Sequence, residues 1–118
     1  MCFDQGEWRD RARFFKHTLR KAHRREDVVS QSRRRSLYFS DVNVEKIETE
    51  AVNNGKYLVS NGTKTIHKIH EFSDDVGASD ERRSRWVIVE STSGVTHGYP
   101  ITEDEFNQWQ KETRECCK

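Results

Sequence analysis

Between Leu37 and Tyr99, short runs in which apolar and polar residues alternate are separated by residues that favour turns. A two-residue repeat puts every second side chain on one face of a strand, so the pattern predicts an antiparallel sheet of five or six strands. The turn residues Asn53-Asn54-Gly55, Asn61-Gly62 and Thr92-Ser93-Gly94 favour a meander. The expected strands are Leu37–Val44, Lys46–Val52, Lys56–Ser60, Thr63–Glu71, Arg85–Ser91 and Val95–Tyr99.

The run Trp86-Val87-Ile88-Val89 is apolar at every position. A strand of this kind has both faces covered, so we expect it inside the sheet or in a sheet that curls. The stretch from Ser73 to Ser84 carries mixed charges and predicts a solvated loop. A chain of 118 residues with 32% hydrophobic residues fits a single domain with a small core.

Helix start signals flank the predicted sheet. Asp4 and Glu7 can form a capping box, and an amphipathic helix is predicted from Gln5 to about Asp27. The residues of its apolar stripe are Trp8, Ala12, Phe15, Leu19 and Ala22. The segment Val28–Arg35 has no period of either kind and is expected to be a linker or a frayed helix end.

A second capping box is formed by Thr102 and Glu105, and Phe106 and Trp109 then share one helix face. This pattern predicts a C-terminal helix within residues 101–118. The predicted fold class is therefore α+β: a basic amphipathic helix and linker over residues 1–36, an antiparallel sheet over 37–100, and a closing helix.

Charge is distributed unevenly along the chain. The first 36 residues contain 11 Lys and Arg against 5 Asp and Glu, whereas the remaining residues contain 10 against 15. The net charge of only +1 hides this asymmetry. A segregated field steers encounters with a partner of opposite sign.

Basic side chains at three- and four-residue steps form a ridge on the predicted first helix. Such ridges bind polyanions because neutralised phosphates release counterions, and guanidinium groups also pair with carboxylates. Phe14 lies among these cations and is either a stacking platform or covered by a sheet edge. The candidate partner-binding residues are Arg9, Arg13, Phe14, Lys16, Arg20, Arg24, Arg33, Arg34 and Arg35.

An acidic face is the alternative binding surface. Glu45, Glu48 and Glu50 could form an acidic surface of the predicted sheet that resembles the phosphates of a nucleic acid. The sequence does not choose between this face and the basic helix.

Three histidines raise the possibility of acid–base chemistry, because imidazole titrates near neutral pH. His67 and His70 are three residues apart on one predicted strand and therefore face opposite sides. At most one of them can pair with His97 on another strand. Ordinary surface or buried histidines are the alternative interpretation.

No metal or cofactor site is predicted. Asp74, Asp75, Asp80 and Glu81 do not have the spacing of a calcium loop and suggest a solvated acidic loop. The cysteines, Cys2, Cys116 and Cys117, lack metal-ligand spacing and suit a reducing compartment. Residues 1–11 do not have the pattern of a secretory signal, and no apolar run is long enough to cross a bilayer, so we expect a cytoplasmic protein.

Three functional hypotheses follow. The sequence favours a small non-enzymatic interaction protein that binds and modulates or inhibits a nucleic-acid-handling partner, by analogy with the small charged modulators of phages and mobile elements. The expected partner is an acidic macromolecule, either a protein complex or a nucleic acid. The second is direct binding of DNA or RNA. The third is a small nuclease that uses His97 with His67 or His70. The oligomeric state is left open.

Overall fold

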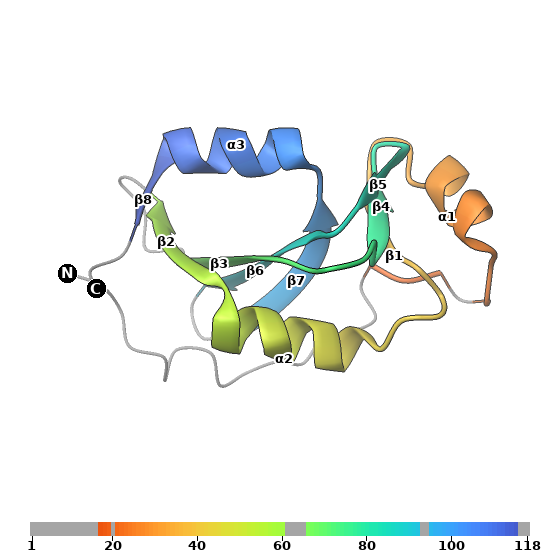
Figure 1. Ribbon diagram of the computed structural model, residues 1–118, viewed down its shortest axis with the longest axis horizontal. Helices are drawn as coiled ribbons and strands as arrows, with labels where there is room; N and C mark the ends of the chain where they lie inside the picture. Colours follow the sequence, from red (N-terminus) through yellow and green to blue (C-terminus); the bar gives the residue numbers. More distant parts are fainter. Residues whose placement is uncertain (1–16, 20, 61–65, 93–94, 116–118) are drawn as a thin grey trace.

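The computed structural model describes residues 17–19, 21–60, 66–92 and 95–115. Five strands form its main sheet in the spatial order β7-β6-β3-β2-β8, and all neighbours are antiparallel. The strands are β2 (Lys56–Ser60), β3 (Ile66–Glu71), β6 (Trp86–Thr92), β7 (Val95–Ile101) and β8 (Thr113–Glu115). Helix α2 (Val44–Asn54) covers one face of this sheet and α3 (Glu103–Glu112) covers the other (Figure 1).

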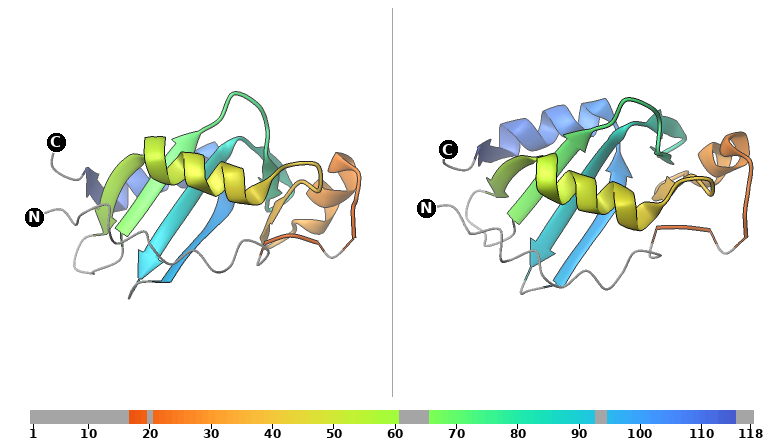
Figure 2. Two further views of the ribbon diagram at one scale, coloured as in Figure 1. Left: turned by 90° about the horizontal axis from the view of Figure 1, so that it is seen from below. Right: turned by 60° about the horizontal axis from the view of Figure 1, so that its bottom comes forward.

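A smaller sheet lies beside the main one, in the order β1-β4-β5. It comprises β1 (Ser36–Tyr38), β4 (Gly77–Ser79) and β5 (Arg82–Ser84), with α1 (Arg25–Gln31) next to it (Figure 2). Val28, Leu37 and Phe39 form a separate apolar cluster there.

Strand β6 is an interior strand of the main sheet, which confirms the expectation for the run Trp86–Val89. Val87 and Val89 pack in the cluster that includes α2, whereas Ile88 packs in the cluster that includes Phe106 of α3. All three β6 residues are fully buried. The strand is apolar at successive positions because a helix covers each face of the sheet.

The region 46–52, predicted as a strand, belongs to helix α2. Asn43 caps this helix, because its Oδ1 accepts a hydrogen bond from the Lys46 amide at 3.1 Å. Val44, Ala51 and Val52 are buried on one side, as a helical repeat requires. Asn53 and Asn54 end the helix and Gly55 follows it, so these residues do not form the expected hairpin turn.

The predicted helix from Gln5 to Asp27 agrees with the structure only at its last three residues, which begin α1, and is wrong at the other residues that can be compared. Residues 5–16 and 20 lie outside the described residues, and residues 17–19 and 21–24 are not helical. The carbonyl of His17 instead accepts a hydrogen bond from the Tyr38 amide at 2.8 Å, which ties this segment to β1. The helix observed nearby, α1, occupies part of the expected linker.

The expected loop between Ser73 and Ser84 contains the hairpin of β4 and β5. Its turn residues Asp80 and Glu81 have φ values of 48° and 65°, a conformation for which hairpins favour Asn, Asp or Gly followed by Gly. Asp80 fits this preference, but Glu81 stands in place of the glycine, so the turn signal there is weak. Two sheets replace the single predicted meander, and the predicted strand Leu37–Val44 is reduced to β1.

The C-terminal helix is confirmed in α3. The Glu105 amide donates to Thr102 Oγ1 at 3.1 Å and Glu105 Oε1 accepts from the Thr102 amide at 3.1 Å, which is the predicted capping box. The helix ends at Glu112 and is followed by β8. Within the described ranges, no helix has both the length and the apolar character that crossing a bilayer requires.

Candidate acid–base site on the sheet

Three titratable side chains lie in line across the main sheet. The strand register places His67 of β3 opposite Glu90 of β6, and Glu90 opposite His97 of β7. Directly opposite residues of antiparallel neighbours share a face of the sheet. We call His67, Glu90 and His97 the histidine–glutamate row; it lies on the face that α3 covers.

The two oxygens of Glu90 have different surroundings. Oε1 accepts a hydrogen bond of 2.7 Å from the Tyr99 hydroxyl and lies 3.9 Å from His67 Nδ1. Oε2 lies 3.9 Å from His97 Nε2. Tyr99 therefore fixes one oxygen of the carboxylate, and the other oxygen faces the imidazole of His97.

Exposure decreases from one end of the row to the other. The His97 side chain is 25% exposed and that of Glu90 is 19% exposed, whereas the His67 side chain is only 2% exposed. The His67 ring packs against Trp109 of α3, with ring centroids 4.4 Å apart. Glu90 and His97 are thus the members of the row that solvent reaches.

Burial sets the protonation of two side chains at this site. Desolvation lowers the pKa of His67, and the opposing effect of Glu90 is smaller, so this imidazole is neutral at neutral pH. Burial, followed by the charge of Glu90, raises the pKa of Tyr99 far above its usual value. The Tyr99 hydroxyl consequently stays protonated and acts as a donor to Glu90.

His17 joins this site from a different part of the chain. Its ring centroid lies 5.2 Å from that of Tyr99 and 6.2 Å from that of His97. His17 Nδ1 donates to the Ser36 carbonyl at 3.2 Å, which fixes the imidazole at the edge of the small sheet. In sequence, Lys16 directly precedes His17.

The opposite side of β7 is held by α2. A Cβ atom at Gly98 would lie 2.8 Å from Cδ of Glu48, so only glycine permits this close approach. Glu48 is 2% exposed and accepts a hydrogen bond of 2.8 Å from the Tyr38 hydroxyl, whose pKa is raised by burial and by Glu48. These contacts fix the strand that carries His97 and Tyr99.

His70 is separate from the row, as its spacing from His67 predicts. It lies on the α2 side, where Nε2 is 3.3 Å from Glu50 Oε2 and the ring packs on Phe72 at 4.7 Å. The sequence-based expectation that at most one of His67 and His70 can pair with His97 is therefore confirmed. The pairing of His67 with His97 runs through Glu90.

The predicted partner-binding residues fall into two groups. Arg9, Arg13, Phe14, Lys16 and Arg20 lie outside the described residues, and Arg24, Arg33, Arg34 and Arg35 are exposed at α1 and at the turn after it. The Arg24 side chain is 82% exposed although it lies 3.6 Å from Asp27, and that of Arg33 is 71% exposed although it lies 4.0 Å from Glu81. Such exposed ion pairs leave the cations open to other anions.

The expected acidic sheet face does not exist. Glu45, Glu48 and Glu50 are on α2, and Glu48 is buried, so this set cannot present a row of phosphate-like charges. Within the part of the chain that is described, no group of three or more His, Cys, Asp or Glu side chains is arranged to hold a metal ion.

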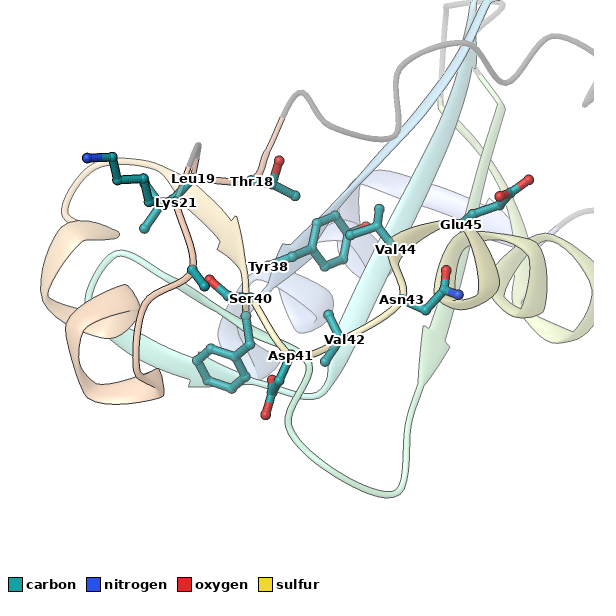
Figure 3. A pocket seen from close by; sticks show the side chains of 12 residues that line it. Thr18, Leu19, Lys21, Tyr38, Ser40, Asp41, Val42, Asn43, Val44 and Glu45 are labelled. Atoms are coloured by element: carbon teal, nitrogen blue, oxygen red, sulfur yellow. The ribbon is translucent and has the colours of Figure 1, made fainter.

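A pocket of about 700 Å³ lies between residues 18–19 and 21–22 on one side and residues 38–45 on the other (Figure 3). Several polar groups that line it already have internal partners. Ser40 accepts from the His23 amide at 3.0 Å, Asp41 pairs with Arg25 at 3.1 Å, and Asn43 caps α2. No member of the histidine–glutamate row lines this pocket. We treat the row as the candidate site because several polar groups of the pocket already bond within the protein.

Sequence reasoning identified His67 and His97 but missed Glu90, Tyr99 and His17. Glu90 directly follows the apolar run of β6, and Tyr99 is two residues after His97 and so shares its face. Both signals were present in the strand pattern. His17 could not be found, because its place beside β7 depends on the fold.

The fold and the site define an α+β protein with an acid–base cluster on one sheet face. Comparison with protein-family models, with curated proteins and with solved structures gave no match to this chain.

Proposed function

We propose that this protein cleaves RNA by general acid–base catalysis at the histidine–glutamate row. The observation that carries the proposal is the position of Glu90, which has one oxygen fixed by Tyr99 and the other facing the partly exposed His97. A carboxylate and an imidazole side by side can accept and supply a proton near neutral pH. Of the three hypotheses, the geometry favours the histidine-dependent nuclease.

RNA is the substrate that matches this chemistry, because its 2′-hydroxyl is an internal nucleophile. Glu90 accepts the 2′-hydroxyl proton as the 2′-oxygen attacks phosphorus. The bond from phosphorus to the 5′-oxygen breaks, and protonated His97 gives its proton to that oxygen. The products are a 2′,3′-cyclic phosphate and a 5′-hydroxyl end.

The remaining residues have supporting roles in this proposal. Tyr99 orients Glu90 through its hydrogen bond, and the neutral His67 imidazole lies behind the same oxygen. Cations to bind the phosphates are supplied by the basic N-terminal segment, whose Lys16 and Arg20 are close neighbours of His17 in sequence.

Cleavage of a labelled single-stranded RNA tests the proposal. Glu90→Gln and His97→Ala should each lower the rate by about 100-fold or more, since removing a general base or acid typically costs that much. His70→Ala is the matched control, because this histidine lies on the opposite face and should leave the rate unchanged. Cleavage should persist with a chelator present, and single-stranded DNA should stay intact.

Two results would contradict the proposal: a wild-type rate for either Glu90→Gln or His97→Ala, or equal cleavage of DNA. Folding of each variant is checked by thermal unfolding. The cyclic phosphate end provides a direct assay of the reaction type.

A second candidate is a non-enzymatic protein that binds an acidic macromolecule through its basic residues. The exposure of Arg24 and Arg33 favours it. Under this alternative, substitution of Glu90 or His97 leaves function intact, and reversal of the basic charges abolishes it.

A further inference from the structure

Two members of the histidine–glutamate row are accessible to solvent. Glu90 and His97 are 19% and 25% exposed, and they sit on a sheet face that α3 crosses (Figure 1). In-line attack requires the 2′-oxygen, phosphorus and the 5′-oxygen to align, which the regular A-form helix prevents. A single strand can bend over these side chains and adopt this geometry, whereas a regular duplex cannot.

Aromatic rings extend the row at both ends. At one end, the Trp109 ring of α3 packs on His67, with ring centroids 4.4 Å apart. At the other end, the rings of Tyr99 and His17 pack beside one another and beside His97. Trp109 is partly exposed and is held by α3 above the sheet. Unpaired nucleobases stack on such side chains, and each stacked base adds affinity without requiring a particular sequence.

We infer that the substrate is single-stranded RNA and that Trp109 is the stacking platform for a nucleobase next to the scissile phosphate. This inference rests on the proposed function for its reaction, but base stacking on Trp109 is measured separately from cleavage. The indole binds the base, and the Glu90–His97 pair acts on the neighbouring phosphate. Trp109 is therefore a residue that determines specificity for single strands.

Binding is measured with a 2′-O-methyl RNA oligonucleotide, which lacks the nucleophile and cannot be cleaved. By fluorescence anisotropy, Trp109→Ala should bind this single strand about tenfold more weakly than the wild type. Trp109→Phe retains a smaller ring in the same core position and should give an intermediate loss. The wild type should bind the single strand more tightly than the corresponding duplex.

Trp86→Phe is the matched control. Trp86 also packs on α3, with its ring 4.1 Å from that of Phe106, but it lies four residues along β6 from Glu90. Its replacement should leave binding unchanged. Wild-type affinity in both Trp109 variants, or equal affinity for duplex and single strand, would overturn the inference.

Glu90→Gln separates this inference from the proposed function. If the proposed function and the stacking platform at Trp109 are both correct, this variant binds the 2′-O-methyl single strand like the wild type and no longer cleaves RNA. Normal cleavage by Glu90→Gln removes the proposed function while a binding loss at Trp109 still supports the stacking platform. If Trp109→Ala unfolds, Trp109→Phe decides the question.

Discussion

Glu90 is a charged residue on a strand whose preceding residues form the buried centre of the sheet. Its carboxylate is tolerated there because Tyr99 donates a hydrogen bond to it and His67 and His97 flank it. Partial burial strengthens the interactions among these groups relative to water. These contacts explain how a carboxylate is held at this position of the sheet.

His67 makes the stability of the fold depend on pH. Its pKa in the folded state is lowered by burial from the ordinary value of 6.5, so the unfolded chain takes up a proton first as the pH falls. The free energy of unfolding should be at its full value above pH 6.5 and should decrease as the pH falls through the folded-state pKa. Chemical denaturation between pH 8 and pH 5 measures this effect.

His67→Gln supplies the comparison for that experiment, because glutamine is polar but does not titrate. The variant should lose less stability on acidification than the wild type, whatever its stability at pH 8. Equal slopes for the two proteins over this range would contradict the assignment.

At the scale of the elements, α3 depends on its N-terminal capping box. Glu105 Oε1 accepts hydrogen bonds from the Thr102 amide at 3.1 Å and from Ser79 Oγ at 2.8 Å, so the cap also joins α3 to the small sheet. The start of α3 is thereby fixed relative to β4. Trp109 is carried by the same helix.

Thr102→Ala should lower the free energy of unfolding by about 1 kcal/mol, because it removes the side-chain acceptor of the Glu105 amide. Urea denaturation is the measurement. Thr102→Ser keeps the hydroxyl and should retain most of the stability. A loss of the same size in both variants would show that the hydroxyl cap is not the cause.

For the whole molecule, the uneven charge predicts binding that weakens with salt. The triple variant Arg33→Glu, Arg34→Glu and Arg35→Glu should bind single-stranded RNA more weakly than the wild type. The slope of log affinity against log salt concentration should also be shallower, by about 0.7 for each phosphate contact that is lost. Arg13→Glu, Lys16→Glu and Arg20→Glu test the N-terminal part in the same way. Affinity is measured by anisotropy from low to high salt.

Charge reversal of Lys46 and Lys111, which are exposed on α2 and α3, is the control for net charge. If these reversals change the salt dependence as much as the arginine variants do, the effect is one of total charge. The basic segment would then have no special role in binding.

Local alternation of apolar and polar residues was sufficient to predict β2, β3, β6 and β7. The capping residues Thr102 and Glu105 predicted the C-terminal helix, and together these elements gave the α+β class. The same pattern also separated His67 from His70, since successive side chains of a strand alternate between faces. The alternating pattern was misleading for residues 46–52, which belong to a helix. Val44, Ala51 and Val52 fit the helical repeat, and Asn43 caps the helix at its start.

Only the tertiary structure decided what depends on contacts between distant segments. The hairpin at Asp80 and Glu81 has a weak turn signal because Glu81 stands where such turns favour glycine. The chain at His17 is joined to β1 by a hydrogen bond from the Tyr38 amide. The site itself required the register that places Glu90 between His67 and His97. Local sequence determines which face a side chain takes, whereas the register that brings two strands together is set by packing across the whole sheet.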